Sequence, residues 1–246
     1  MNTKTIADYA NVHVNTVRLY EQWSYISPVP RAANGYRQYS AVHQQQMMIA
    51  RLAFRQELIQ NNLRKRATKI VQLSGREQFQ EALNEATSYF NHLKAEHQFV
   101  LEAIHEVEQL LCETPSAPVP LQTHKQMAQR LQLTEETLRN WERNGLYKIE
   151  RNRQNRRQYY ERDYQKLLMI RTLRSAHFSI AAILHLFEQL DNFTPGVDIK
   201  NLLNKPKFTQ YFLYVTDQLE LNLRKAMTDV TEIKQRLSSL IASTHA

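Results

Sequence analysis

Residues 16–25 read TVRLYEQWSY, and residues 137–146 read TLRNWERNGL. Thr, Arg, an aromatic residue and Glu take matching places in the two stretches, and each stretch is followed by RQY, at residues 37–39 and 157–159. The distance of about 120 residues between them is far longer than the roughly 20–50 residues of a solenoid repeat. We therefore expect the chain of 246 residues to contain two domains of the same fold.

The composition favours an all-α protein. The chain has only 4 Gly and 7 Pro and is rich in Gln, Leu, Arg and Glu, which are good helix formers. Its single cysteine, Cys112, excludes a disulfide framework and is typical of a reducing compartment. No apolar run approaches the roughly 18 residues of a membrane span, and the N-terminus has no signal-peptide pattern. We expect a soluble, cytoplasmic protein with no membrane partner.

Positive charge is concentrated in one kind of segment. The net charge is +8, and residues 139–174 hold 11 Lys or Arg against four acidic residues. Residues 77–108 hold seven acidic residues, with Lys94 as the one basic residue. A segment so basic indicates a polyanionic partner, most simply double-stranded DNA. Charge alone also leaves open a basic surface that only contacts solvent.

Each half begins with a pattern of two short helices joined by a tight turn. In the first half, Ile6 and Ala7 fall on the first helix and Val14 begins the second. Asn11 stands in the turn between them, where a left-handed backbone conformation is tolerated. In the second half, Thr134 is placed to cap the second helix, and acidic residues follow in its first turn. Small and apolar residues around such a turn are typical of a helix-turn-helix.

A hairpin pattern follows the first helix-turn-helix. Residues 28–39 read PVPRAANGYRQY. The prolines oppose helix formation and Asn34-Gly35 is a strong signal for a tight turn, so we expect a small β-hairpin, the wing of a winged helix. In the second half the prolines are absent and Asn155-Arg156 replaces the Asn-Gly-Tyr sequence. We therefore expect the second wing to have another shape.

Each half ends in a pattern for a long helix. From Phe79 to Leu111, apolar residues recur in alternating steps of four and three, which is the pattern of a coiled-coil seam. A second seam runs from Phe208 to Leu240, with a stutter near Asn222. A Pro-rich stretch separates the two halves.

These patterns predict an all-α fold with small β-wings, in which two winged helix-turn-helix domains are each followed by a long coiled-coil helix. The expected segments are the first winged helix at 1–73, its long helix at 74–112, a linker at 113–120, the second, degenerate winged helix at 121–191, a connector at 192–207 and the second long helix at 208–246.

The order of the elements and two motifs resemble the MerR family of transcriptional regulators. The most specific motifs are TVRLYE at residues 16–21 and NGYRQY at residues 34–39, and the resemblance extends over nearly the whole chain as two tandem halves. It implies winged-helix dimers that are joined by an antiparallel coiled coil and bind promoter DNA. Many such proteins activate by untwisting an overlong promoter spacer, so RNA polymerase is implied as an indirect partner. Leu19 departs from the family pattern, which usually has tyrosine there.

The residues expected to contact DNA come from the second helix and the wing of each half. Polar side chains on the helix suit base edges and phosphates, and a tyrosine hydroxyl and the wing suit the neighbouring backbone. In the first half they are Asn15, Thr16, Arg18, Tyr20, Tyr36 and Arg37. In the second half they are Thr137, Arg139, Arg153, Arg156 and Arg157, with Arg151 in addition. We expect the arginines of the second wing to read DNA shape more than sequence.

Structural roles are the alternative for several of these residues. Arg18 and Arg139 would also fit as surface ion-pair partners of Glu21 and Glu142. Taken singly, four aromatic residues fit a hydrophobic core better than a DNA contact, namely Tyr20, Tyr39, Trp141 and Tyr159. The repeated pattern, rather than any one residue, favours DNA binding.

Two assemblies fit this organisation. The linker of about eight residues spans at most about 28 Å, enough to place the second winged helix where a partner's would lie in an antiparallel coiled coil. The chain would then be its own pseudo-dimer, in which His97 lies close to Asn222 and the polar interruptions of the two seams meet. A homodimer with four winged helices is the alternative.

The sequence predicts no catalytic, metal or cofactor site. A thiolate metal sensor needs at least two cysteines, and Cys112 stands alone. No phosphate-binding Gly loop or Ser/His/Asp constellation is evident, so we expect no enzyme. The expected function is sequence-specific transcription regulation by a single-chain pseudo-dimer, with an unknown small-molecule effector as an open partner. The alternative is an architectural or chromosome-anchoring DNA-binding protein without an effector response.

Overall fold

The computed structural model describes residues 1–56, 62–112, 122–191, 199–200 and 218–244, and these residues are mainly helical. The chain divides into two compact units, one of Met1–His97 with Asn222–Ala246 and the other of Gln98–Leu221. The predicted linker at 113–120 lies outside the described residues, as do most of the connector at 192–207 and the first part of the second long helix, 208–217.

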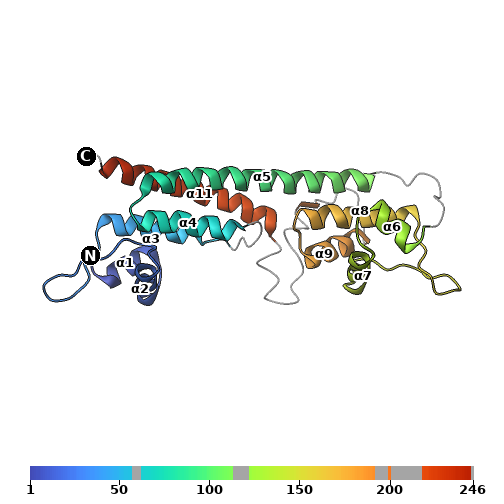
Figure 1. The fold of residues 1–246 in the computed structure, drawn as a ribbon, viewed down its shortest axis with the longest axis horizontal. Coiled ribbons are helices and arrows are strands. Elements are labelled where there is room, and N and C mark those ends of the chain that lie inside the picture. The colour runs from blue at the N-terminus through green and yellow to red at the C-terminus, as the bar shows by residue number, and fades with distance from the viewer. Residues whose placement is uncertain (57–61, 113–121, 192–198, 201–217, 245–246) are drawn as a thin grey trace. The chain divides into compact units, whose positions relative to one another are not determined.

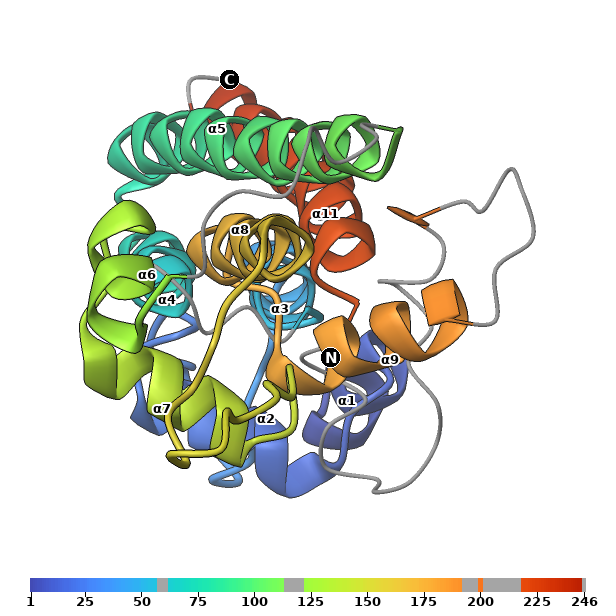
Figure 2. The ribbon, with the colours of Figure 1, turned by 90° about the vertical axis from the view of Figure 1, so that its right-hand side faces the viewer.

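The first unit is built in layers of paired helices. Its helices are α1 (Thr3–Ala10), α2 (Val14–Gln22), α3 (Ala41–Ala53), α4 (Leu63–Gly75), the first part of α5 (Phe79–Cys112) and most of α11 (Leu219–Thr244). Figures 1 and 2 both place α3 and α4 between the α1–α2 pair on one side and α5 with α11 on the other. The α1–α2 pair is therefore held on a helical support.

The α1–α2 pair is the helix-turn-helix expected from the sequence. Asn2 caps α1 by accepting a hydrogen bond from the backbone N–H of Thr5 at 2.9 Å. Asn11 ends α1 in the left-handed conformation, with φ 50°, as predicted. Ile6 and Val17 are fully buried in the small core that the two helices share with α3.

A buried glutamine ties the chain after α2 to α3 and α4. The side-chain Oε1 of Gln46 accepts hydrogen bonds from the backbone N–H and the hydroxyl of Ser27, at 2.8 and 3.0 Å. Its Nε2 donates to the carbonyl oxygen of Ser74 at 2.8 Å. Next to it, a Cβ atom on Gly75 would lie only 2.1 Å from the carbonyl oxygen of Ser24, so this close approach requires glycine.

The second unit contains a helix order that matches the first. Its helices are α6 (His124–Arg130), α7 (Glu135–Arg143), α8 (Glu161–Ser175) and α9 (Ile180–Asp191), together with the rest of α5. Thr134 caps α7 by accepting from the backbone N–H of Thr137 at 3.1 Å, and Glu135 and Glu136 occupy its first turn, as predicted. Thr123 and Gln126 form a capping box at the start of α6.

The predicted apolar stripes of the long helices are largely buried. In α11 the buried residues include all of the expected Ala226, Val230, Ile233, Leu237 and Leu240. In α5, Ala82 and Tyr89 are buried, whereas the expected Leu83 and Phe90 are half-buried. The buried face of α5 still includes the predicted positions Phe79, Ala86, Leu93, Val100, Ile104 and Val107. It is widened by Ala82 and Tyr89, because within the first unit this helix covers α4 as well as α11 (Figures 1 and 2).

Candidate nucleic-acid interface

One face of α2 presents four exposed side chains at the spacing of a single helical stripe. They are Asn15, Arg18, Leu19 and Gln22, and we call them the α2 row. Within the described residues no ion pair or side-chain hydrogen bond engages Arg18. A guanidinium flanked by two amides is the set of groups that binds guanine and adenine edges. Leu19 and Gln22 were not among the residues predicted from the sequence, although their i+4 and i+7 spacing from Asn15 was a readable signal.

The other residues predicted on α2 are less open. Thr16 is half-buried, on the side of the helix next to the α2 row. Tyr20 is half-buried against the core of the first helix-turn-helix, and burial raises the pKa of its hydroxyl. Its ring lies 5.4 Å from that of Tyr25 in an edge-on arrangement. Tyr20 therefore contributes to packing, and its phosphate contact stays a prediction.

The chain after α2 forms a hairpin closed by an isolated antiparallel bridge between Arg31 and Arg37. At its turn, Gly35 has φ 81° and donates its N–H to the carbonyl oxygen of Ala32 at 2.8 Å. Tyr36 lies at this turn with 73% of its surface exposed. Its ring is therefore open to solvent, and its contact with DNA stays a prediction.

The corresponding hairpin of the second unit repeats this geometry. Arg151 and Arg157 form the equivalent bridge, and the N–H of Asn155 donates to the carbonyl oxygen of Asn152 at 2.8 Å. Asn155 takes the left-handed conformation, with φ 59°, at the position of Gly35. The expectation of another shape was wrong, because asparagine tolerates the left-handed backbone that glycine provides in the first hairpin.

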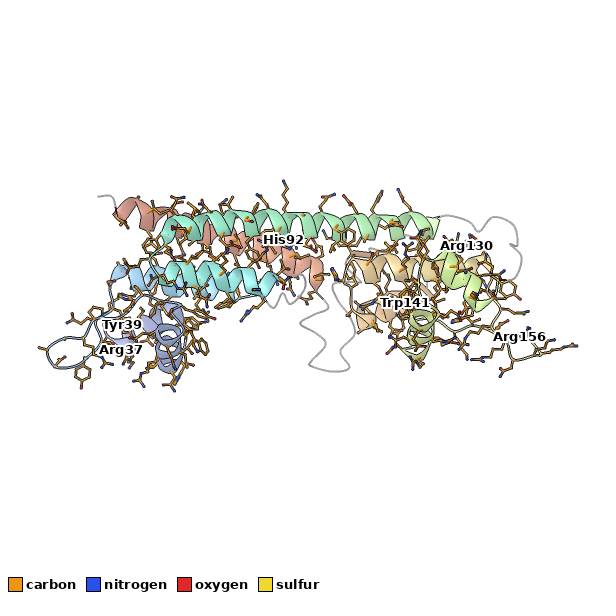
Figure 3. The ribbon with its side chains drawn as sticks, in the orientation of Figure 1. Arg37, Tyr39, His92, Arg130, Trp141 and Arg156 are labelled. Carbon is orange, nitrogen blue, oxygen red and sulfur yellow. The ribbon has the colours of Figure 1, made fainter. Side chains whose placement is uncertain are left out.

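The second hairpin carries a larger positive charge than the first. Arg151, Arg153 and Arg156 are all exposed, and Lys148 is exposed at its base. Figure 3 shows Arg156 on the loop that extends away from α6 and α7. No carboxylate within the described residues pairs with Arg153 or Arg156. These two predicted residues are therefore exposed without a carboxylate partner in the described part of the chain, and their contact with DNA stays a prediction.

In each unit an arginine of the hairpin is paired with a glutamate of the second helix. Arg37 Nε donates to Oε2 of Glu21 at 2.7 Å, and Arg157 Nε donates to Oε2 of Glu142 at 2.8 Å. All four side chains are about three-quarters buried. Glutamates at these positions were considered as partners for Arg18 and Arg139, but they instead connect the helix to the hairpin. Arg37 (Figure 3) and Arg157 are thus engaged within the protein.

The second helix of the second unit has its own arginines paired. Arg139 lies 3.1 Å from a carboxylate oxygen of Glu135 and 3.3 Å from one of Glu136. Arg143 lies 2.6 Å from the other oxygen of Glu136. Thr137 is half-buried, and its backbone and hydroxyl both contact Thr134. The residues predicted to bind DNA on α7 are therefore satisfied within the helix.

Three of the four aromatic residues named as core alternatives are buried. Tyr39, Trp141 and Tyr159 are 3%, 5% and 1% exposed, so the tryptophan that replaces Tyr20 has moved into the core. Figure 3 labels Tyr39 next to Arg37 and Trp141 among the helices of its own unit. Burial raises the pKa of the Tyr159 hydroxyl, which lies 2.7 Å from His124 Nδ1.

His124 links the hairpin of the second unit to its second helix, a contact that the sequence did not reveal. Its Nδ1 contacts the hydroxyl of Tyr159, and its Nε2 lies 3.1 Å from the carbonyl oxygen of Glu135. Tyr147 donates its hydroxyl hydrogen to the carbonyl oxygen of Leu138 at 2.9 Å, and burial raises the pKa of the Tyr147 hydroxyl. These hydrogen bonds fix the base of the hairpin against α7.

Two further features concern the described part of the chain. No group of three or more His, Cys, Asp or Glu side chains that would hold a metal ion occurs there. None of the helices described is long and apolar enough to cross a membrane.

One part of the second unit matches a known protein family. Residues 123–190, which contain α6 to α9, match the family described as MerR HTH family regulatory protein. This segment therefore carries a helix-turn-helix domain of the MerR type, a class that indicates DNA-binding transcription regulation. No curated protein and no solved structure matches the chain. The matched half is the one that the sequence had suggested to be the more divergent.

Proposed function

We propose that the chain is a sequence-specific DNA-binding regulator of transcription of the MerR type, made of two tandem winged helix-turn-helix halves. The observation that carries the proposal is the family match of residues 123–190. The first half is included because its hairpin bridge and its Arg37–Glu21 pair have counterparts at Arg151–Arg157 and Arg157–Glu142. In this proposal promoter DNA is the direct partner, RNA polymerase is an indirect one, and the protein is not an enzyme.

We further propose that the long helices pack antiparallel and that one chain acts as its own pseudo-dimer. The course of α11 beside α5 in the first unit supports this direction of packing, since residue numbers rise from left to right along α5 and from right to left along α11 in Figure 1. Contacts with α3 place α11 in the same unit. Asp229 Oδ1 lies 2.8 Å from Arg55 Nη1, whereas Arg236, further along α11, donates to Gln45, at the start of α3, at 2.8 Å. Residue numbers thus rise in opposite directions along α11 and α3. The Lys234 ammonium also lies over the ring of Phe90 of α5, at 5.6 Å from its centre.

Selection of bound fragments from a genomic library, followed by footprinting, tests the function. A regulator protects one or a few promoter sites, whereas an architectural protein protects many. On a protected site, Arg18→Ala is expected to weaken binding by about 1–3 kcal/mol, because an unpaired guanidinium on α2 contacts a base or a phosphate. Arg76→Ala removes the same charge at the exposed end of α4 and is expected to have little effect. Equal effects of the two substitutions would contradict the proposal.

Light scattering of the dilute full chain tests the assembly. A mass of one chain, 29.1 kDa, is expected while site-specific DNA binding is retained. A strictly dimeric protein at low concentration would contradict the pseudo-dimer and favour the homodimer with four winged helices.

A further inference from the structure

The row of α7 that corresponds to the α2 row differs from it in composition. Matching Arg18 with Arg139 and Glu21 with Glu142 places the remaining positions by counting along each helix. The α2 row of Asn15, Arg18, Leu19 and Gln22 then corresponds to Glu136, Arg139, Asn140 and Arg143, which we call the α7 row. A glutamate therefore stands in α7 where the first unit has asparagine.

That glutamate holds the polar groups of the α7 row to one another. One carboxylate oxygen of Glu136 lies 2.6 Å from Arg143 Nη2, and the other lies 3.3 Å from Arg139 Nη1. The amide oxygen of Asn140 accepts a hydrogen bond from Asn144 Nδ2 at 2.9 Å. Each of the four side chains of the α7 row thus contacts another polar side chain nearby. In contrast, Arg18 in the α2 row pairs with no carboxylate among the described residues.

The strength of these pairs does not by itself keep the α7 row from DNA. All three charged side chains of the row are about half or more exposed, and ion pairs as exposed as these contribute little to stability. A phosphate could therefore displace the glutamate from either arginine. Glu136, however, lies within the row and divides its carboxylate between both arginines, so a phosphate or base that approaches either arginine meets this carboxylate first.

From this difference we propose that the two helix-turn-helix heads are unequal: the α2 row reads base sequence, and Glu136 keeps the α7 row from reading it. The second head then contacts DNA through the phosphate backbone, with the exposed Arg153 and Arg156 of its hairpin. This inference rests on the proposed function. It assigns Leu19 and Gln22 as additional specificity-determining residues, with Leu19 suited to the methyl group of thymine.

Binding of the full chain to a mixed-sequence duplex tests the role of Glu136. Fluorescence anisotropy is measured at several salt concentrations between about 50 and 200 mM. Glu136→Gln is expected to bind about tenfold more tightly and to steepen the dependence of log affinity on log salt by about 0.9, the value for one added phosphate contact. Adding Arg139→Ala and Arg143→Ala to this variant is expected to abolish the gain, because the freed arginines make the new contacts.

Glu135→Gln is the matched control, since it removes the same charge from the same helical turn but leaves Glu136 bonded to both arginines. It is expected to change affinity by less than Glu136→Gln. Equal gains from the two variants, or a gain that persists without the arginines, would reduce the effect to net charge and overturn the inference. No gain in Glu136→Gln would overturn it as well. Thermal unfolding of each variant verifies that α7 is intact.

A second comparison tests the α2 row itself on a footprinted site. Gln22→Ala is expected to relax base preference at one position of the site, whereas Arg143→Ala, at the matching position of α7, leaves base preference unchanged. Relaxed preference in Arg143→Ala would show that both heads read sequence and would overturn the inference. Absence of any DNA binding by the unmodified chain would instead contradict the proposed function, so the two failures are distinguishable.

Discussion

Arg37 of the first hairpin donates from Nε to Oε2 of Glu21 on α2 at 2.7 Å, with both side chains about three-quarters buried. The pair spans the two surfaces proposed to contact DNA. In the second unit Arg157 and Glu142 make the same contact. This ion pair joins the hairpin to α2 beside the packing of Val29 and Tyr39 in the core that contains Val17. We infer that Glu21 positions the wing.

Glu21→Gln is therefore expected to weaken DNA binding, although it makes the surface more positive. Loss of the charge-assisted hydrogen bond lets the hairpin move, and the predicted contacts of Tyr36 with the DNA backbone are then lost. A weakening of about threefold to tenfold corresponds to one phosphate contact. Affinity for the footprinted site is measured, with Glu77→Gln as an exposed acidic control. Tighter binding by Glu21→Gln would show that its charge matters more than its position.

Gln46→Leu is expected to destabilise the first unit by about 2–4 kcal/mol, as a buried donor and a buried acceptor lose their partner. The side chain is fully buried and makes hydrogen bonds to Ser27 and Ser74. Denaturant unfolding measures the loss. Gln44→Leu, two residues earlier on the same helix and half-buried, is expected to change stability by less than about 0.5 kcal/mol. Similar losses of stability from both substitutions would show that the hydrogen bonds of Gln46 are not the cause of the destabilisation.

Sequence patterns predicted the local elements well, because their causes are local. The Asn11 turn, the Thr134 cap and the apolar stripe of α11 follow from backbone preference, capping and periodicity, and all are present. Pairing between distant side chains was harder to predict. Glu21 looked equally suited to Arg18, three residues away on the same helix, and to Arg37, which only the folded hairpin brings near it. The geometry of the second hairpin was missed since asparagine substitutes for glycine at its turn.

Asp229 of α11 carries a buried carboxylate. Replacing this charge with a neutral hydrogen-bond acceptor is expected to cost the folded state little stability. Burial raises its pKa above the ordinary value, in spite of hydrogen bonds from Arg55 at 2.8 Å and Gln56 at 3.1 Å. Because the folded state favours the protonated form, stability contributed by this group is lost as pH rises from about 4 through the raised pKa. At neutral pH, Asp229→Asn keeps an acceptor without a charge.

The unfolding free energy of Asp229→Asn at pH 7 is therefore expected to equal that of the unmodified chain or to exceed it by up to about 1 kcal/mol. Asp229→Ala, which removes the acceptor as well, is expected to be less stable than Asp229→Asn. Chemical denaturation at pH 7 compares the three proteins. A loss in Asp229→Asn as large as in Asp229→Ala would mean that the ion pair with Arg55 outweighs the burial of the carboxylate.

His43 at the start of α3 is expected to make the first unit less stable in mild acid. Its Nδ1 accepts a hydrogen bond from the backbone N–H of Ser40 at 3.0 Å, which requires the neutral ring. Burial lowers the pKa of His43 below its ordinary value, outweighing the carbonyl oxygens of Pro28 and Ser27. The folded state therefore disfavours the protonated ring. Stability from this group is complete above the ordinary pKa of about 6.5 and is lost as pH falls below it toward the lowered pKa.

His43→Gln separates this effect from that of the other histidines. Glutamine at the third position of a helix also accepts a hydrogen bond from the N-cap N–H, so the cap is kept without a titrating group. Unfolding free energy is measured by denaturant titration from about pH 7.5 to 5. The unmodified chain is expected to lose more stability over this range than His43→Gln does. Parallel pH profiles would show that His43 accepts its proton as readily in the folded protein as in the unfolded chain, and that the cap survives protonation.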